Sequence, residues 1–343
     1  MILIRVDGNE KVGLGHVMRC LSIADALKDN GEEVLFVTAD AKCKTLLKAR
    51  GFPHIILHSD YADMDGEIDA LCALIEEHQP SAVLVDSYFV TDRCLTALKE
   101  RVKLIYVDDL LAFSYPVDIL INYNIFADAE EYQRLYRDTA DVPQIVLGTE
   151  YTPLRKEFSQ VTPRPQPQIA NKVLISTGGA DPQHIALSMI RYLARNAEAF
   201  ADLAFTFIIG GANMDLDEIR ELSDGIDQIK IVYNVSEMSK LMCEHNIAVS
   251  AAGSTLYELC ACGLPTITYV LADNQIPAAK VFSEKGVMID AGDVRKDADF
   301  IQHIFAAVQK LSQNQEQRMN MARAAVCLAD GRGAYRLATM ITQ

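Results

Sequence analysis

The sequence contains no apolar run that approaches the roughly 18 residues needed to cross a bilayer, and no dense block of Lys and Arg. Acidic side chains are in excess, 47 against 32 basic ones, which gives a formal net charge of −15. Such a charge repels nucleic acids and anionic membrane surfaces. We therefore expect neither membrane insertion nor a nucleic-acid partner. A small anionic ligand remains compatible with this charge, because salt screens remote charges beyond about 8 Å.

The chain also lacks the features of exported, disulfide-bonded proteins. Residues 1–6 form a strand-like run without a basic leader or cleavage site, and the eight cysteines include no C-x-x-C pair. The cysteines are scattered through apolar segments, which is typical of buried, reduced thiols. The sequence therefore predicts a cytoplasmic protein without a metal site, and it specifies no oligomeric state.

The 343 residues, 50% of them hydrophobic and 23% charged, are sufficient for about two folded domains. Short runs rich in Val, Ile and Phe alternate with segments of helical periodicity. The expected strands are 1–6, 33–38, 82–86, 103–108, 119–122 and 144–147 in the first half, and 172–176, 204–209, 229–233, 247–250, 265–270 and 287–290 in the second. Because these strands lack polar alternation and are followed by helices, they predict parallel sheets covered on both faces.

A proline-rich segment separates the two halves. Residues 162–167 carry prolines at alternate positions, which excludes both a helix and a central strand. We therefore expect an N-terminal α/β domain over 1–160, a connector over 161–170 and a C-terminal α/β domain over 171–343. Ligands of open α/β sheets bind beyond the carboxyl ends of the strands, so two such domains facing each other would form a cleft there.

A glycine loop with the sequence Gly13-Leu14-Gly15-His16-Val17-Met18-Arg19 follows the first strand. Gly13 and Gly15 allow close approach of a ligand, and a helix starting near His16 directs its free amides to the same place. The loop resembles a dinucleotide fingerprint only loosely, because Met18 replaces the third glycine. The helix end disfavours an imidazolium, which predicts a neutral His16 acting as a general base. The alternative is a structural histidine that caps the helix or packs under the turn.

Acidic residues end two further strands of the first half, in Asp86-Ser87-Tyr88 and Asp108-Asp109. Paired carboxylates suit acid–base chemistry, but Asp at a strand end commonly caps the next turn, and we favour that role for Asp109. Arg19 is expected either to balance an anionic substrate or to pair with Asp7.

The second half offers two loops suited to an anion. Strand 172–176 leads into Gly178 and Gly179, and strand 247–250 is followed by Ser254 and Thr255. Glu258 lies one helical turn further on, where a carboxylate can accept both hydroxyls of a ribose. The alternative is a capping box formed by Thr255 and Glu258, in which the carboxylate serves its own helix.

Amide side chains follow the strand expected at 265–270. Asn274 and Gln275 have donors and an acceptor that suit a sugar bearing N-acetyl groups. Alternatively, Asp273 or Asn274 is simply a helix N-cap.

Together these segments resemble the GT-B fold family of nucleotide-sugar enzymes. More narrowly, the chain is similar to the UDP-2,4-diacetamido-2,4,6-trideoxy-beta-L-altropyranose hydrolase (PseG) family of pseudaminic acid biosynthesis. The segments that carry the resemblance are Arg5-Val6-Asp7, the loop 12–19 with His16, Asp86-Ser87-Tyr88, residues 176–182, residues 250–258 and residues 272–275.

The resemblance implies two Rossmann-like α/β domains facing across a cleft, and a UDP-sugar as substrate. It implies hydrolysis of a UDP-linked 2,4-diacetamido-2,4,6-trideoxyhexose at the anomeric C–O bond, with inversion and without a metal or cofactor. UDP and the free sugar would be released for pseudaminic (nonulosonic) acid biosynthesis, with His16 activating the water. The resemblance further implies Gly178, Gly179, Ser254 and Thr255 at the diphosphate, Glu258 at the ribose, Arg5, Asp7, Tyr88, Asn274 and Gln275 around the sugar, and Gly13 and Gly15 in the catalytic loop.

Two other functions remain open. The same motifs occur in spore-coat polysaccharide proteins described as glycosyltransferases, which implies an alcohol acceptor in place of water. A non-catalytic UDP-sugar sensor would bind UDP without cleaving any donor. A histidine at a helix start, between two domains that each carry a glycine-rich turn, argues against this function.

Overall fold

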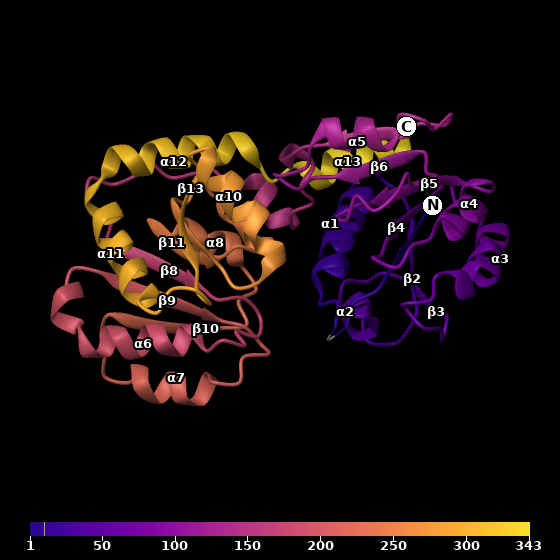
Figure 1. Ribbon diagram of the computed structural model, residues 1–343. Helices are drawn as coiled ribbons and strands as arrows, with labels where there is room; N and C mark the ends of the chain where they lie inside the picture. Colours follow the sequence, from indigo (N-terminus) through magenta and orange to yellow (C-terminus); the bar gives the residue numbers. More distant parts are fainter. Residues whose placement is uncertain (10) are drawn as a thin grey trace. The chain divides into compact units, whose positions relative to one another are not determined.

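The computed structural model describes residues 1–9 and 11–343, which fold into two compact units (Figure 1). Unit 1 consists of Met1–Lys156 and Gly331–Gln343, and unit 2 of Glu157–Asp330. Each unit contains one parallel sheet, and both sheets have the 3-2-1-4-5-6 strand order of Rossmann folds. The expectation of two Rossmann-like α/β domains is confirmed. No helix in the described ranges is both long and apolar enough to span a bilayer.

The sheet of unit 1 has the order β3-β2-β1-β4-β5-β6-β7. Its strands are β1 (Ile2–Val6), β2 (Val34–Thr38), β3 (His54–Ile56), β4 (Ala82–Asp86), β5 (Lys103–Val107), β6 (Ile119–Asn122) and β7 (Gln144–Leu147). Its helices are α1 (Gly15–Asp29), α2 (Lys44–Ala49), α3 (Ile68–His78), α4 (Asp92–Lys99), α5 (Ala129–Leu135) and α13 (Gly333–Thr342), with short 3₁₀ turns at Asp65–Glu67 and Thr149–Tyr151. The short edge strand β3 was not expected.

The sheet of unit 2 has the order β10-β9-β8-β11-β12-β13. Its strands are β8 (Lys172–Ser176), β9 (Ala204–Ile209), β10 (Ile229–Tyr233), β11 (Ile247–Ala251), β12 (Thr266–Val270) and β13 (Met288–Asp293). Its helices are α6 (Ile185–Arg195), α7 (Leu216–Ser223), α8 (Met238–Cys243), α9 (Thr255–Ala261), α10 (Ile276–Glu284), α11 (Phe300–Gln313) and α12 (Gln315–Leu328), with 3₁₀ turns at Ala197–Phe200 and Asp273–Gln275. A further 3₁₀ turn, Lys156–Gln160, lies at the boundary between the units.

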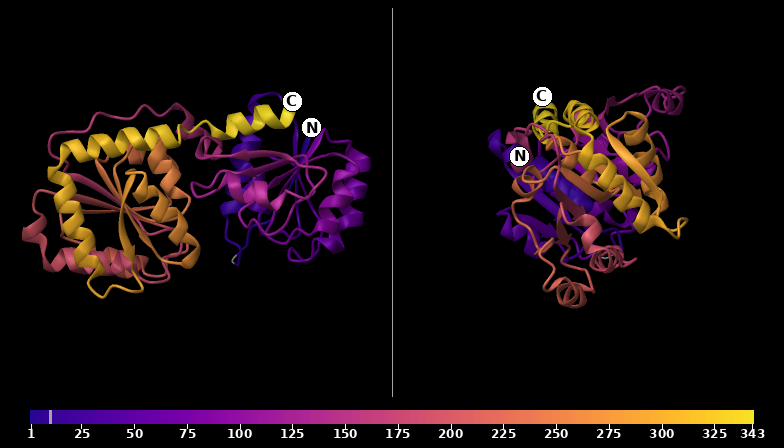
Figure 2. Two further views of the ribbon diagram at one scale, coloured as in Figure 1. Left: turned by 45° about the horizontal axis from the view of Figure 1, so that its top comes forward. Right: turned by 90° about the vertical axis from the view of Figure 1, so that its left-hand side faces the viewer.

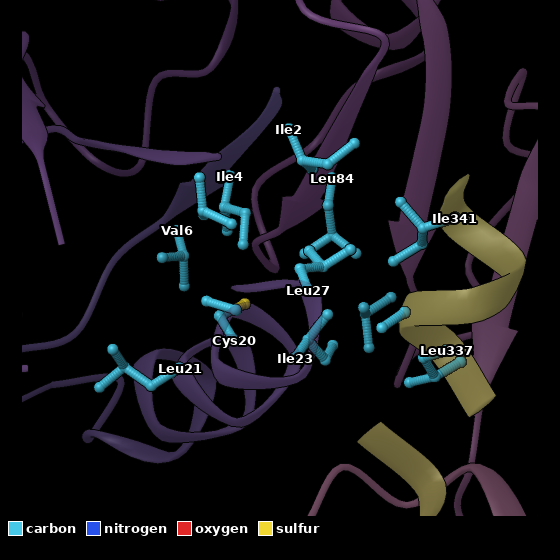
Figure 3. Close-up of a cluster of buried hydrophobic side chains, with 14 of the residues drawn as sticks. Ile2, Ile4, Val6, Cys20, Leu21, Ile23, Leu27, Leu84, Leu337 and Ile341 are labelled. Carbon is cyan, nitrogen blue, oxygen red and sulfur yellow. The ribbon is translucent and has the colours of Figure 1, made fainter. Parts of the chain in front are cut away.

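Helices cover both faces of the central strands, which explains their continuous apolar sequence. All five residues of β1 are buried, and alternate side chains enter different clusters. Ile2, Ile4 and Val6 pack with residues of α1 on one face, as Figure 3 shows, whereas Leu3 joins the cluster on the other face. Polar groups therefore collect at the ends of the strands, where no helix covers them.

The last helix corrects the expected domain boundary. Residues 331–343 leave unit 2, and α13 packs against α1 of unit 1, where Figure 2 shows this yellow helix among the indigo and magenta elements. Leu337 and Ile341 enter the same buried cluster as Ile23 and Leu27 (Figure 3). The assignment of 171–343 to the C-terminal domain is thus wrong for its end. An apolar helical stripe predicts burial but does not specify which core receives it.

The proline-rich segment belongs to unit 2 and is held against it. The guanidinium of Arg318, which is fully buried, donates to the carbonyl oxygens of Pro167 at 2.5 Å and Gln168 at 3.1 Å, and to that of Leu311 at 2.6 Å. The chain passes between units at 156–157 and 330–331 instead. Residues 161–170 form neither helix nor strand, as their prolines predict, but they form a strap on unit 2 and do not mark the border.

All eight cysteines are free thiols. Six are buried, whereas Cys243 is half-buried and Cys327 is exposed. The expectation of free thiols is met, and that of burial is wrong for Cys327.

Candidate active site

The expected ligand-binding residues gather where the strand order of each sheet reverses. In unit 1 this occurs between β1 and β4, and in unit 2 between β8 and β11. The crevice at the carboxyl ends of such a strand pair is the general ligand site of open α/β sheets. His16 follows β1 and Asp86 ends β4, while Gly178 follows β8 and Ser254 follows β11.

His16 is the second residue of α1, and its side chain is fixed on two sides. The ring atom Nδ1 lies 2.5 Å from Oδ1 of Asp86. Tyr88 packs edge-on against the ring, with centroids 4.4 Å apart and planes at 85°. Leu14 is the N-cap of α1 and no side chain caps the helix, so the alternative of a capping role for His16 is not observed. Only 6% of the residue is exposed.

Asp86 is a buried carboxylate whose charge is stabilised by its neighbours. Burial acts to raise the pKa of Asp86, but the charge of Arg19 and hydrogen bonds from Arg19 and His16 outweigh it, and the pKa lies well below its ordinary value. Arg19 binds Asp86 in a bidentate manner, with Nε 2.6 Å from Oδ2 and Nη2 2.6 Å from Oδ1. Asp86 is therefore ionised throughout the neutral pH range.

The charge of Asp86 determines the tautomer of His16. A carboxylate only accepts hydrogen bonds, so Nδ1 carries the hydrogen and donates, and Nε2 of the neutral ring keeps its lone pair. Nη2 of Arg19 also lies 3.0 Å from Nδ1, but both atoms are then donors and this contact is not a hydrogen bond. Among residues 1–9 and 11–343, Nε2 has no hydrogen-bond partner. The pair has the geometry of an Asp-oriented general base.

Arg19 extends this network to two further strand ends. Its Nη2 lies 2.8 Å from Oδ2 of Asp109, and its Nη1 donates to the hydroxyl of Tyr123 at 2.8 Å. Arg19 thus pairs with Asp86 and Asp109, whereas the sequence suggested Asp7 or a substrate. The single positive charge of Arg19 pairs with the two negative charges of Asp86 and Asp109, so the group carries a net charge of about −1 beside His16.

Asp108, rather than Asp109, binds the turn that follows β5. It accepts hydrogen bonds from the backbone N–H of Leu110 at 2.8 Å and from the hydroxyl of Tyr132 at 2.5 Å, and it is fully buried. The capping role favoured for Asp109 is therefore wrong, because its carboxylate contacts Arg19. The two neighbouring acids have separate functions, one in the fold and one in the network around His16.

A small pocket opens beside the His16 ring. It is lined by Asp7, Val12, His16, Tyr61, Asp86, Ser87, Tyr88 and Phe89. Its cavity volume is about 10 Å³, which corresponds to a single water position. The pocket thus brings an imidazole and two carboxylates beside a space for one water molecule.

Arg5 lies beneath this pocket and does not reach its surface. Its guanidinium is completely buried, donates to both oxygens of Glu67 at 2.7 Å, and also binds Asp7. Asp7 accepts a further hydrogen bond from the backbone N–H of Ala39 at 2.8 Å. In this structure Arg5 is not available to a ligand, contrary to expectation, because its donors are directed to Asp7 and Glu67. Asp7 itself remains in the pocket wall.

The glycine loop before α1 contains one glycine required by the backbone and one that is not. Gly13 has a φ of +76° and donates to the carbonyl oxygen of Asn9 at 2.8 Å, which closes the turn. Gly15 has an ordinary φ, and a Cβ added there would meet no atom within 4 Å. The fold therefore does not require a glycine at Gly15, and its bare backbone faces open space.

The two expected anion loops of unit 2 end neighbouring strands, since Ser176 of β8 is paired with Ser250 of β11. Gly178 has a φ of +90°, and Gly178 and Gly179 are exposed. Ser254 is exposed at the N-cap of α9, and its side chain makes no capping hydrogen bond. The sheet thus brings these backbone amides and the Ser254 hydroxyl to one edge, as an anion site requires.

The structure decides the alternative given for Thr255 and Glu258 and shows the surroundings of Asn274 and Gln275. Ser254, not Thr255, is the N-cap of α9, so Thr255 and Glu258 do not form the expected alternative of a capping box. Glu258 is half-buried one turn into the helix. Asn274 is exposed in the turn before α10, whereas Oε1 of Gln275 accepts a hydrogen bond from the backbone N–H of Leu271 at 2.8 Å. Gln275 therefore also stabilises its own loop.

A larger cavity of unit 2 lies away from these loops. It has a volume of about 530 Å³ and is lined by Ser283, Gly286, Met288, Ile289, Asp290, Asn314, Glu316, Gln317, Asn320 and Met321. These residues belong to the end of α10, the first half of β13 and the start of α12, not to the ends of β8 and β11. Its lining is mainly uncharged polar groups and methionines, so volume alone does not identify the ligand site.

The sequence resembles several characterised and uncharacterised proteins. An uncharacterized protein of Methanocaldococcus jannaschii is 28% identical over 286 residues, which are 80% of this chain and 56% of that protein. The UDP-2,4-diacetamido-2,4,6-trideoxy-beta-L-altropyranose hydrolase of Campylobacter jejuni is 24% identical over 293 residues, 84% of this chain and 98% of the hydrolase. The spore coat polysaccharide biosynthesis protein SpsG of Bacillus subtilis is 19% identical over 346 residues, 98% of this chain and 96% of that protein. The expected resemblance to the hydrolase family is confirmed.

Solved structures with the same fold have less similar sequences. MurG of Acinetobacter baumannii superposes with a TM-score of 0.72 at 14% identity, covering 99% of both chains. The S. aureus MnaA–UDP complex gives a TM-score of 0.64 at 14% identity, covering 99% of this chain and 96% of that one. These likenesses concern the fold alone, and they confirm the GT-B architecture.

One family model matches across the second half of the chain. It is described as the glycosyltransferase family 28 C-terminal domain and covers residues 162–337, from the proline strap into α13. Because this match includes just over half of the residues, the chain belongs to the glycosyltransferase family 28 C-terminal domain family.

Proposed function

We propose that this protein is an enzyme that processes a UDP-sugar for surface-glycan biosynthesis, and specifically an inverting UDP-sugar hydrolase. The substrate would be a UDP-linked 2,4-diacetamido-2,4,6-trideoxyhexose, and the products UDP and the free sugar used for pseudaminic (nonulosonic) acids. Similarity to the Campylobacter hydrolase over 98% of its length supports this substrate. The name of a Helicobacter pylori protein, of which this chain matches 45%, includes the same hydrolase activity.

The observation that carries the proposal is the His16–Asp86 pair beside a pocket of one-water size. Nε2 of His16 accepts a proton from water as the water oxygen bonds to C1 of the sugar. The C1–O bond to the diphosphate breaks, and its electron pair leaves with UDP. Attack from the face opposite UDP inverts C1. Asp86 stabilises the imidazolium that forms, and such general-base assistance contributes about 10²–10⁴-fold to a rate.

The loops of unit 2 are assigned to the leaving group. Gly178, Gly179, Ser254 and Thr255 would bind the diphosphate through backbone amides and hydroxyls, which stabilises the charge that UDP gains as it departs. Glu258 would accept the ribose hydroxyls.

The remaining assignments concern the sugar. Tyr88, Asn274 and Gln275 would contact it, and Asn274 and Gln275 suit its acetamido groups. Arg5 would act through Asp7, because it is buried beneath the pocket.

A glycosyltransferase is the second candidate, supported by the family 28 domain and by similarity to the Bacillus spore coat polysaccharide protein. The same base would then remove a proton from an alcohol acceptor. The two functions differ only in the nucleophile.

The test is UDP release from a panel of UDP-diacetamido sugars in H₂¹⁸O, with and without alcohol acceptors. A hydrolase releases UDP without an acceptor, and one ¹⁸O enters the free sugar because C1 is attacked. Label in the nucleotide would indicate attack at phosphorus and contradict the proposed bond cleavage. Release only in the presence of an acceptor would establish the transferase, and UDP binding without turnover would establish a sensor.

A further inference from the structure

Asp7 shares the small pocket with His16 but reaches it from a different position. It follows β1 directly, whereas His16 lies beyond the glycine loop in α1. Only 8% of Asp7 is exposed, and its carboxylate is part of the pocket wall. The groups of the pocket that can accept hydrogen bonds therefore include the Nε2 lone pair of His16 and the oxygens of Asp7.

Within residues 1–9 and 11–343, the hydrogen bonds of Asp7 leave part of its carboxylate unused. Oδ1 accepts from the backbone N–H of Ala39 and Oδ2 from Nη1 of Arg5. A carboxylate offers about four acceptor positions, so about two remain for a molecule in the pocket. The contacts with Ala39 and Arg5 also fix the direction of the carboxylate, which a positioning role requires.

The fold does not favour a charge at this position. Arg5 pairs with two acids, Asp7 and Glu67, and its bidentate contact is with Glu67. Burial raises the pKa of Asp7, and the attraction of Arg5 offsets this effect only in part. An ionised Asp7 thus costs stability at neutral pH, and a carboxylate kept at such a cost in a pocket indicates a functional role.

We infer that Asp7 is a second catalytic residue, which holds the nucleophilic water together with His16. One O–H of the water donates to Nε2 of His16 and the other donates to Asp7, which leaves a lone pair of the oxygen for C1. His16 takes the proton as the new bond to C1 forms, and Asp7 remains ionised. The negative charge of Asp7 also stabilises the positive charge that develops on the sugar ring. This inference rests on the proposed hydrolase function.

The experiment compares Asp7→Asn with Glu67→Gln in the full-length protein. Both variants remove a buried carboxylate from Arg5 without a change of size, but Glu67 does not line the pocket. If Asp7 holds the water, kcat for UDP release falls at least roughly tenfold further in Asp7→Asn than in Glu67→Gln. KM and the Kd of UDP change less than about twofold in Asp7→Asn. Equal kcat values for the two variants would overturn the inference, because Asp7 would then be only an ion-pair partner.

Chemical rescue provides a readout that a structural role would not move. Asp7→Ala leaves room for a small carboxylate, and added formate should restore part of kcat without a change in melting temperature. No rescue, in a variant that remains folded and binds UDP, would contradict the assignment. A wild-type protein that releases UDP from no donor would instead reject the hydrolase function itself, which separates the two failures.

Discussion

Asp86 accepts a hydrogen bond from Nδ1 of His16 at 2.5 Å while both its oxygens accept from Arg19. The carboxylate thereby fixes the ring and its tautomer, and Arg19 fixes the carboxylate. His16 and Arg19 come from the first turns of α1 and Asp86 from the end of β4, which lie together because β1 and β4 are neighbours in the sheet.

Replacing Asp86 with Asn should lower kcat by roughly 10²-fold and change KM little. The amide can turn its NH₂ group toward Nδ1 and stabilise the tautomer that carries the hydrogen on Nε2, which cannot accept a proton. Steady-state UDP release measures the effect. Asp108→Asn makes the same change in another buried aspartate outside the pocket and should keep kcat within about twofold. Unchanged kcat in Asp86→Asn would show that Asp86 does not control the base.

Asp86 should also stabilise the folded protein in a pH-dependent way. Its pKa is lower in the folded protein than the ordinary value of about 3.9 expected after unfolding. Its contribution is therefore complete above about pH 5 and is lost as the pH falls below about 4. Urea unfolding of wild type and Asp86→Asn at several pH values measures the difference between their free energies of unfolding. That difference should shrink on acidification, and a constant difference would contradict the ion-pair account.

Three glycines of unit 2 separate a ligand effect from a packing effect. Gly179 has an ordinary φ and an added Cβ would meet nothing within 4 Å, so Gly179→Ala should keep the melting temperature but weaken UDP binding at least tenfold, on the order of 1.4 kcal/mol. A Cβ on Gly210 would lie 2.2 Å from the carbonyl oxygen of Gly179, so Gly210→Ala should reduce both the melting temperature and the affinity for UDP. A Cβ on Gly211 would be 3.8 Å from the Tyr233 hydroxyl, so Gly211→Ala should change neither the melting temperature nor the affinity for UDP.

Calorimetric titration with UDP and thermal unfolding check these three variants. If Gly179→Ala binds UDP with wild-type affinity, the diphosphate does not bind at the loop of Gly178 and Gly179. A lower melting temperature in Gly211→Ala would show that the loop after β9 does not tolerate an added methyl group at Gly211 either.

The C-terminal helix should be an integral part of unit 1. Leu337 is fully buried against α1, and Leu337→Ala should reduce the free energy of unfolding by about 2–5 kcal/mol. Thr339→Ala alters an exposed position on the same helix and should cost about 0.5 kcal/mol or less. Denaturant unfolding measures both variants. Equal, small effects would show that α13 does not stabilise the fold.

Most of the fold could be predicted because buried parallel strands have continuous apolar sequences. The exception β3 has only three residues, His54–Ile56, too few for a recognisable pattern. The placement of α13 was missed for a different reason. Its apolar stripe is clear, but the cores of both units are apolar, and nothing local distinguishes them.

The site was predicted in part, and the division is physical. His16 was predicted as a base because the glycine loop and the helix start are local in sequence, and the structure places it in the wall of the small pocket. The contact of His16 with Asp86 and those of Arg19 with Asp86 and Asp109 were not predicted. These residues lie close together only because of the order of the strands in the sheet. Arg5 was expected at the ligand because it is charged, but a side chain on a central strand buried on both faces meets other buried groups first.

The most direct test of the account is the turnover of His16→Asn with a UDP-linked diacetamido-trideoxyhexose, measured as UDP release without an acceptor. The account predicts that kcat falls by about 10²–10⁴-fold while KM and the Kd of UDP stay close to wild type. Turnover near that of wild type would contradict it, because His16 would then not activate the nucleophile.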